Sequence, residues 1–170
     1  WQHSAWYGRR SGRLRVTALD VGQGDATLVD LPDGRLMLID GGGFVGVPID
    51  PGERVILPTL RARRRDRVDI LVLTHPHPDH YGGLLSVARH VAIGEFWYGE
   101  ANPPRAHRGH ADEAPTHPGG AGHAPGSSTY RELLELLRQR GVVLRTAAEL
   151  CAHGGRVDPL VQVLHPCPGV

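Results

Sequence analysis

The feature that most constrains the fold is an apolar segment, residues 68–73, that passes directly into a cluster of histidines and an aspartate. Its length and its Val, Ile and Leu content predict a strand that is buried on both faces. Four potential metal ligands follow within six residues: His75, His77, Asp79 and His80. A strand covered on both faces requires layers on either side, so the pattern favours a layered α/β fold with a site where this strand ends.

The chemistry of this loop suits divalent metal ions. Neutral imidazole and carboxylate groups bind zinc, manganese or iron at roughly 2.0–2.2 Å. Each of the two prolines in the loop favours extended geometry at the histidine before it, and side chains two apart in an extended chain point the same way. His75 and His77 can therefore bind one ion, and Asp79 and His80 a second. Two ions about 3.5–4 Å apart would activate a water molecule and bind a carbonyl or phosphoryl oxygen. Asp79 is the candidate catalytic residue.

A polar loop that is rich in histidine by chance is the alternative interpretation. It does not account for the strand directly before the loop or for Gly82-Gly83 directly after it. Residues 101–128 also contain four histidines, but these stand among Pro, Gly and Ala with almost nothing to bury. We predict that residues 101–128 form a disordered surface insertion rich in Gly, Pro and His.

Strands and helices are expected to alternate along the rest of the chain. Apolar alternation and turn residues predict strands at residues 14–19, 26–31, 35–39, 93–98, 142–146 and 157–164. Apolar periodicity predicts helices at residues 53–65 and 81–90, and a third that begins with a capping box of Thr129 and Glu132 and ends at Gly141. This order supports the layered α/β fold.

Composition excludes several classes of protein. The chain has 170 residues with Lys+Arg 19 and Asp+Glu 18, so it is not a strongly basic nucleic-acid module. Its apolar stretches are far shorter than the roughly 18 residues that a membrane span needs. Because the chain begins at Trp1 and its only Met is Met37, we expect a piece of a longer protein, with residues 1–13 as a leader from an upstream region. Cys151 and Cys167 are too few for a disulfide framework, and their pairing stays open.

Several segments together resemble a known family. Residues 74–83, Thr-His-Pro-His-Pro-Asp-His-Tyr-Gly-Gly, resemble the metal motif of the metallo-β-lactamase superfamily. Three earlier segments are similar to the C-terminal hydrolase domain of ComEC-type DNA-uptake proteins: residues 20–25 (Asp-Val-Gly-Gln-Gly-Asp), 38–42 (Leu-Ile-Asp-Gly-Gly) and 56–60 (Ile-Leu-Pro-Thr-Leu). The resemblance is strong over residues 14–98 and weak over residues 129–166.

The resemblance implies a metallo-β-lactamase-like four-layer αββα sandwich with a dinuclear site at the edges of its sheets. On this fold His75 and His77 would bind the first ion and Asp79 and His80 the second, with Zn²⁺ or Mn²⁺ as the metal. Asp40 would orient the histidines by hydrogen bonds, or it would only cap a turn. Three more residues are candidate loop contacts: Asp20, Gln23 and Asp25.

The later part of the sequence departs from the family. The superfamily's further ligands, a Gly-Asp whose carboxylate bridges the ions and a His within a His-His-Gly-Ser stretch, have no match here. We therefore expect residues 14–170 to be a C-terminally incomplete domain, the first half of the sandwich plus the start of the second, that holds one ion or none. His153 and His165 lie in no matching motif and are interpreted as structural.

An arginine cluster precedes the metal motif. Its members are candidate phosphate contacts for a nucleic-acid strand at the metal site, although the solvated face of a helix is the favoured interpretation: Arg61, Arg63, Arg64, Arg65 and Arg67. The turns Gly22-Gln23-Gly24 and Gly41-Gly42-Gly43 could also offer backbone N–H groups to a phosphate, but tight turns explain both.

The resemblance implies a metal-dependent phosphodiesterase or nuclease that acts on DNA during competence-related DNA uptake. Its partners would be DNA and a membrane channel domain of the same parent chain. The parent would be a bacterial inner-membrane protein with this domain outside the cytoplasm. One alternative is a free-standing hydrolase of the same fold, in the cytoplasm, that acts on a thioester, a lactam or RNA. Another is a catalytically inert structural or DNA-guiding module.

Overall fold

The structure is a computed structural model that describes residues 12–43, 49–99, 128–152, 155–164 and 167. The predicted leader lies almost wholly outside these residues, as does the predicted insertion apart from Ser128. His153 and His165 lie outside them too. Within the described part, the chain forms a six-stranded sheet and a two-stranded sheet with helices, which confirms the predicted α/β fold class.

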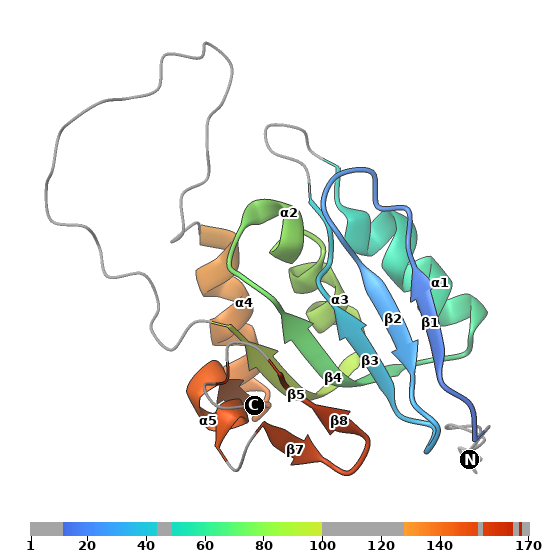
Figure 1. Cartoon of the computed structure of the whole chain (residues 1–170). Helices are drawn as coiled ribbons and strands as arrows, with labels where there is room; N and C mark the ends of the chain where they lie inside the picture. The colour runs from blue at the N-terminus through green and yellow to red at the C-terminus, as the bar shows by residue number, and fades with distance from the viewer. Residues whose placement is uncertain (1–11, 44–48, 100–127, 153–154, 165–166, 168–170) are drawn as a thin grey trace, which may run out of the picture.

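The main sheet contains its six strands in chain order: β1 (Arg15–Ala18), β2 (Thr27–Asp30), β3 (Leu36–Ile39), β4 (Arg67–Leu73), β5 (Ala92–Tyr98) and β6 (Val143–Thr146). The first three strands run antiparallel, and β3 to β6 run parallel (Figure 1). The carboxyl ends of β3, β4 and β5 therefore lie at one edge of the sheet. This edge carries the residues that follow Leu73, which include the histidines.

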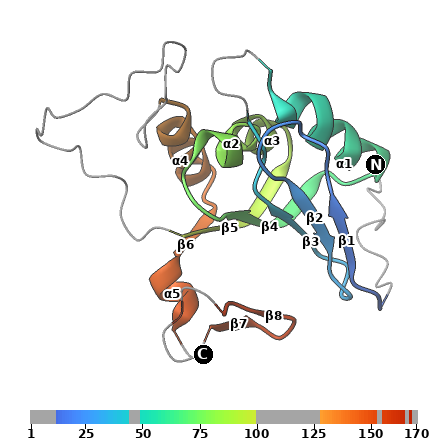
Figure 2. The same ribbon diagram turned by 45° about the horizontal axis from the view of Figure 1, so that its top comes forward.

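Helices cover one face of this sheet (Figures 1 and 2): η1 (Gly52–Ile56), α1 (Leu57–Ala62), α2 (Pro78–Tyr81), α3 (Leu84–His90) and α4 (Ser128–Gln139). Alternation along β3 explains the arrangement, since Leu36 and Leu38 join the buried cluster on the helical side and Met37 joins the cluster on the other side. Leu84 and Leu133 contribute from the helices. Each fully buried leucine stabilises the fold by roughly 1.5–3 kcal/mol.

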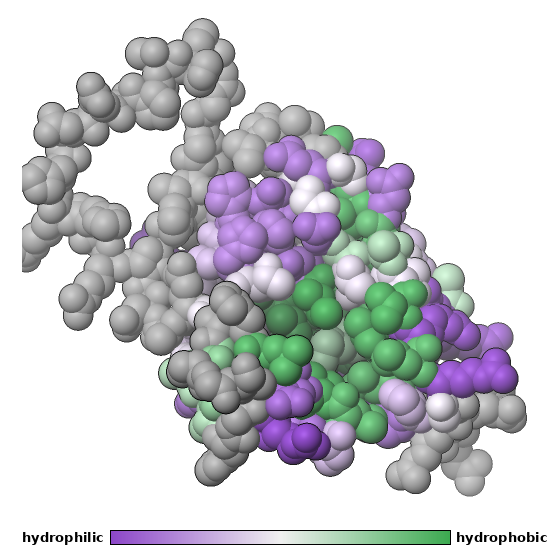
Figure 3. Space-filling view, viewed as in Figure 1, coloured by the Kyte–Doolittle hydropathy of each residue, from purple (hydrophilic) through white to green (hydrophobic). Residues whose placement is uncertain are grey.

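The opposite face of the sheet carries a smaller layer. It consists of α5 (Ala147–Cys151) and a hairpin of β7 (Arg156–Asp158) and β8 (Val161–Gln162) (Figure 2). Ile70, Trp97 and Leu150 join the sheet to this layer in a second buried cluster. Apolar residues gather over the central strands of this face in Figure 3. Cys151 and Cys167 form a disulfide, which decides the pairing that the sequence leaves open.

The predicted strand over residues 157–164 is instead the β7–β8 hairpin. Pro159 has no N–H to donate to a ladder, and Oδ1 of Asp158 accepts a hydrogen bond from the backbone N–H of Leu160 at 2.9 Å. A local turn therefore interrupts what hydrophobicity alone presents as one strand.

Helix boundaries also differ from the prediction. The helix predicted at residues 81–90 is split into α2 and α3, which are separated by Gly82-Gly83. The capping box predicted at Thr129 is wrong, because Thr129 lies inside α4. A capping box does open α5, where Thr146 and Glu149 exchange hydrogen bonds. The pattern that predicts a capping box is short enough to occur inside a helix by chance.

Candidate metal centre

The histidine loop, residues 74–80, begins directly after β4 and continues into the first turn of α2. Pro78 is the first residue of α2, a position that suits its fixed φ. His77, directly before it, has extended backbone with φ −108° and ψ 146°, as expected before a proline. The backbone N–H of His77 donates to the carbonyl of His75 at 2.8 Å, and that of His80 donates to the carbonyl of His77 at 2.9 Å. The loop is therefore shaped by its own backbone.

The structure gathers the four side chains that the sequence singles out as ligands. The ring centroids of His75 and His80 are 4.0 Å apart, and those of His75 and His77 are 6.0 Å apart. Nδ1 of His77 is hydrogen-bonded to Oδ1 of Asp79, and Nε2 of His80 lies 3.9 Å from the same oxygen. Imidazole and carboxylate groups thus share one small region at the edge of the sheet.

The surroundings of Asp79 keep its carboxyl group ionised. Partial burial raises the pKa of Asp79, but the hydrogen bond from His77, a backbone hydrogen bond and the charges of His77 and His80 outweigh this effect and hold the pKa below its ordinary value. The ionised carboxylate is the form that binds a metal ion.

Asp40, directly after β3, lies beneath the histidine loop and is buried. Its Oδ1 accepts a hydrogen bond from the backbone N–H of Thr74 at 2.9 Å. Its Oδ2 accepts from Oγ1 of Thr74 at 2.7 Å and from Nδ1 of His80 at 2.8 Å. The backbone of Asp40 has φ 57°, a left-handed conformation that costs a non-glycine residue about 1 kcal/mol or more. Asp40 therefore occupies a strained turn and also contacts the loop, so both interpretations from the sequence describe part of its geometry.

The imidazole and carboxylate groups of the loop are of the kinds that bind a divalent metal ion, but they do not converge on a single point. Nδ1 of His75 lies 3.1 Å from Oγ1 of Thr74, and Nδ1 of His77 and of His80 bond to carboxylates. A hydrogen bond from one ring nitrogen to an oxygen is the usual support of a metal-binding histidine. Within the described ranges, however, no three His, Cys, Asp or Glu side chains form a group that could hold an ion.

Close backbone contacts explain the glycine-rich turns beside the loop. A Cβ on Gly24 would lie 1.7 Å from the carbonyl oxygen of Asp79, and one on Gly43 would lie 2.0 Å from that of Pro78. Only glycine allows the turns to press against α2 this closely. The N–H groups of residues 41–43 donate to the carbonyls of His80, Asp25 and Gln23 at 2.7, 2.8 and 3.1 Å. These amides are already bonded within the protein, which favours tight turns over phosphate binding.

The candidate loop contacts act mainly through their backbone. Asp20, Gln23 and Asp25 are all exposed. Oδ1 of Asp20 accepts a hydrogen bond from the N–H of Gly22 at 3.2 Å and so caps the turn. Gln23 and Asp25 accept hydrogen bonds through their carbonyl groups. In the described part of the chain, none of the three side chains is hydrogen-bonded to the histidine loop.

The arginine cluster, residues 61–67, lies at the other end of β4 from the histidine loop. Arg67 begins this strand of seven residues, whose length is roughly 23 Å, and the loop follows its end. Arg63 and Arg65 donate to the carboxylate of Asp30 at 3.2 and 3.0 Å. This placement gives no support to phosphate contacts at the histidine loop. The helix-face interpretation fits Arg61 alone, because α1 ends at Ala62 and the other four arginines follow it.

Thr74 makes a contact that the sequence does not predict, because its hydroxyl lies beside both Asp40 and His75. Thr74 also lines an apolar pocket of about 440 Å³ between the sheet and the layer of α5, with Trp97, Leu150 and other residues. A threonine directly before a candidate ligand is the one sequence signal for this contact. The pocket depends on residues far apart in the chain and left no sequence signal.

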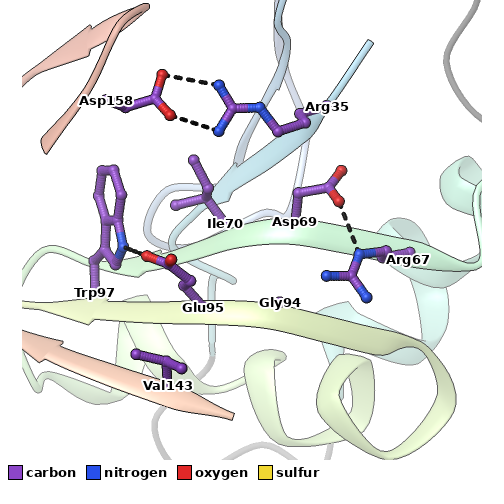
Figure 4. Close-up of a pocket in the computed structure, with 9 residues that line it drawn as sticks. All are labelled: Arg35, Arg67, Asp69, Ile70, Gly94, Glu95, Trp97, Val143 and Asp158. Atoms are coloured by element: carbon purple, nitrogen blue, oxygen red, sulfur yellow. Dashed lines mark hydrogen bonds and ion pairs between the residues drawn. The ribbon is translucent and has the colours of Figure 1, made fainter. Parts of the chain in front are cut away.

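A second pocket, of about 300 Å³, is polar and lies between the main sheet and the hairpin (Figure 4). The charged side chains that line it pair with one another or with close neighbours. The pairs include Arg35 with Asp158 at 2.7 Å and Arg67 with Asp69 at 2.8 Å. Nε1 of Trp97 also donates to a carboxylate, that of Glu95. The first pair joins the main sheet to the hairpin and the other two contacts lie within single strands, so these side chains present no unpaired charge to a ligand.

Comparison with known proteins identifies the family of the chain. Residues 19–166, most of the chain, match the family model described as the metallo-beta-lactamase superfamily. The chain belongs to this superfamily. Membership confirms the predicted fold family and the prediction that the chain is a member of a metallo-hydrolase superfamily.

Relatives in other organisms cover part of the chain. ComE operon protein 3 of Bacillus subtilis (strain 168) is 35% identical over 94 residues, which are 49% of this chain and 12% of that protein. This match confirms the resemblance to the ComEC type. Ribonuclease J of Mycobacterium tuberculosis (strain ATCC 25618 / H37Rv) is 41% identical over 80 residues, 44% of this chain and 14% of that protein. The chain thus matches less than a sixth of the length of either relative.

A solved structure described as a new diphosphatase from the PhnP family is also similar. It is 16% identical to the chain, with a TM-score of 0.39, and the match covers 79% of this chain and 50% of that one.

In the part of the chain that the structure describes, no helix is both long and apolar enough to cross a membrane.

Proposed function

We propose that the chain belongs to a metal-dependent phosphodiesterase that cleaves DNA, and that the histidine loop carries its metal site. The observation that carries the proposal is the meeting of His75, His77, Asp79 and His80 on one loop above a buried Asp40. The similarity to ComE operon protein 3 over half of the chain favours DNA as the substrate. RNA is the second candidate, because ribonuclease J is similar over nearly the same share of the chain.

Each loop residue has a defined role in this proposal. His75 and His77 would hold one divalent ion, Zn²⁺ or Mn²⁺, and Asp79 and His80 a second. Such ions supply Lewis-acid charge and an activated water for attack on phosphorus. Asp79 accepts hydrogen bonds in its ionised form, and it would exchange its bond with His77 for contact with the ion. Asp40 keeps the loop in place through Thr74 and His80.

Cleavage assays test the proposal directly. A protein that contains the complete domain is incubated with single-stranded DNA, double-stranded DNA or RNA, in the presence of Zn²⁺ or Mn²⁺. We expect metal-dependent cleavage of DNA that falls at least about 100-fold in His77→Ala and in Asp79→Ala, because each removes a ligand. His90→Ala, a histidine on α3 outside the loop, is the matched control and should cleave like the natural sequence. Cleavage that is unchanged in His77→Ala would mean a contaminating nuclease, and preference for RNA would favour the second candidate.

We further propose that the chain works with a membrane channel domain of the same parent protein, outside the cytoplasm of a bacterium. The Cys151–Cys167 disulfide supports this location, because disulfides persist in oxidising compartments and are rare in the cytosol. A cytoplasmic location is the alternative. Both thiols should resist alkylation in protein isolated from its native host with free thiols trapped at lysis, and two reactive thiols would contradict the proposed location.

A further inference from the structure

The hydroxyl group of Thr74 lies between two groups of the candidate metal centre. Its Oγ1 is 2.7 Å from Oδ2 of Asp40 and 3.1 Å from Nδ1 of His75. The same carboxylate oxygen is 2.8 Å from Nδ1 of His80. A buried aspartate therefore contacts one candidate ligand directly and a second one through a hydroxyl group.

Counting protons fixes the direction of each hydrogen bond. Thr74 donates its one hydroxyl proton to Oδ2 of Asp40. The hydroxyl oxygen can then only accept from His75, so Nδ1 of His75 carries the proton. By the same reasoning Nδ1 of His80 carries a proton that it donates to Asp40.

We propose that Thr74 is a positioning residue. Its hydroxyl donates to Asp40 and therefore accepts from His75, which holds His75 in the tautomer with a proton on Nδ1. In this tautomer the lone pair of Nε2 is free to bind a metal ion. One buried carboxylate thereby sets the tautomers of two histidines, His80 directly and His75 through the hydroxyl. The inference adds to the proposed function, but the tautomers themselves exist without any metal.

The test measures tautomers in the metal-free chain. The protein is labelled with ¹⁵N at histidine, and long-range ¹H–¹⁵N spectra are recorded in alkaline solution, because only a neutral ring has a tautomer. His90 serves as an internal reference, because its Nδ1 donates to the backbone carbonyl of Ser86 at 2.8 Å. We expect His75, His80 and His90 all to show a protonated Nδ1. A His75 with its proton on Nε2 in the natural sequence would overturn the proposal without any variant.

Substitution at Thr74 separates the transmitted effect from a loss of structure. Thr74→Val keeps the shape but removes the hydroxyl, so His75 should shift toward the other tautomer while His80 keeps its proton on Nδ1. Thr74→Ser should restore the original signal of His75. Thr17→Val is the control. Thr17 lies on β1, its hydroxyl accepts a hydrogen bond from Arg63 at 3.0 Å, and its loss should leave the histidine tautomers unchanged. An unchanged His75 in Thr74→Val would refute the proposal, as would equal changes at His75 and His80.

Metal affinity gives a second readout. Titration with Zn²⁺ should show binding that is about 10–100-fold weaker in Thr74→Val than in the natural sequence, with rescue by Thr74→Ser. Equal affinities in Thr74→Val and the natural sequence would overturn the link between tautomer and binding. If neither protein binds Zn²⁺ or cleaves nucleic acid, the proposed function fails, whereas the tautomer spectra still decide the role of Thr74.

Discussion

At the scale of single residues, Asp40 combines a backbone role with a side-chain role. It closes the turn after β3 in a left-handed conformation, and its carboxylate accepts hydrogen bonds from Thr74 and His80 while it is buried. The sequence placed it at a turn after a strand, and its contacts with the loop come from the parallel pairing of β3 with β4. Backbone strain at this position is tolerated because the hydrogen bonds offset it.

Substitutions at Asp40 separate these two contributions. Asp40→Ala removes the hydrogen bonds and keeps the strain, and we expect it to lower the free energy of unfolding by about 2–4 kcal/mol. Asp40→Gly removes the same bonds but relieves the strain at φ 57°, so it should be about 1 kcal/mol more stable than Asp40→Ala. Urea unfolding measures both values. If the alanine variant is as stable as the glycine variant, strain at this residue is not significant.

At the scale of elements, glycines decide how closely the turns approach α2. The turn before β2 and the turn after β3 both press backbone against backbone at residues 78–79. This contact fixes the height of α2 relative to the sheet and hence the position of Asp79 and His80. The sequence shows the glycines, but the reason for them lies in an element more than thirty residues away in the chain.

Gly24 and Gly141 provide a matched pair for this idea. Both have positive φ, 78° and 69°, but an added Cβ would meet Asp79 only at Gly24, and it would find open space at Gly141. We expect Gly141→Ala to cost about 1 kcal/mol from backbone strain alone. Gly24→Ala should cost at least about 2 kcal/mol more, because α2 must move. If denaturant unfolding gives the same loss of unfolding free energy for both variants, α2 can move aside at no measurable cost.

At the scale of the whole molecule, one ion pair joins the smaller layer to the main sheet, a second lies within the main sheet, and a disulfide closes the smaller layer. Arg35, directly before β3, makes two hydrogen bonds with Asp158 of β7 at 2.7 and 2.8 Å. Glu95 of β5 pairs with Arg145 of β6 at 2.8 Å on the same face. The disulfide joins α5 to Cys167, beyond the hairpin. The wall of the apolar pocket beside Thr74 depends on these connections, since Leu150 and Val163 line it.

The pair of Arg35 and Asp158 predicts a pH dependence of stability. Hydrogen bonds from Arg35 outweigh partial burial and lower the pKa of Asp158 below its ordinary value. Because the pKa is lower in the folded state, the pair stabilises the fold above the ordinary value of about 3.9 and loses this effect as the pH falls through the folded-state value. Asp158→Asn should therefore be less stable than the natural sequence by about 1 kcal/mol at pH 7, and the difference should shrink in more acidic solution.

Urea unfolding at neutral pH and at about pH 2 checks this prediction, since the lower value lies well below the ordinary carboxyl pKa. Glu132→Gln is the control, because Glu132 pairs with Arg89 on the exposed surface of α4, where a salt bridge contributes little. A difference between Asp158→Asn and the natural sequence that stays constant with pH would contradict the assigned cause.

The sequence by itself determined the local features of this protein. The apolar run before the histidine loop, the prolines within it and the glycines after it define β4, the loop and the start of α2, because strand burial and proline geometry act over a few residues. The same local evidence named the four candidate ligands and the family that residues 19–166 match. It failed at the hairpin of β7 and β8 and at the predicted capping box, where short patterns have more than one solution.

Only the tertiary structure decided which distant groups meet. The contact of Asp40 with Thr74 and His80 requires β3 to pair in parallel with β4. The separation of the arginine cluster from the histidine loop follows from their places at opposite ends of β4. The pairing of Cys151 with Cys167 depends on how α5 and the hairpin fold over the sheet. Each is set by sheet register and layer packing, which arise from the summed burial of many side chains and are not encoded in any short segment.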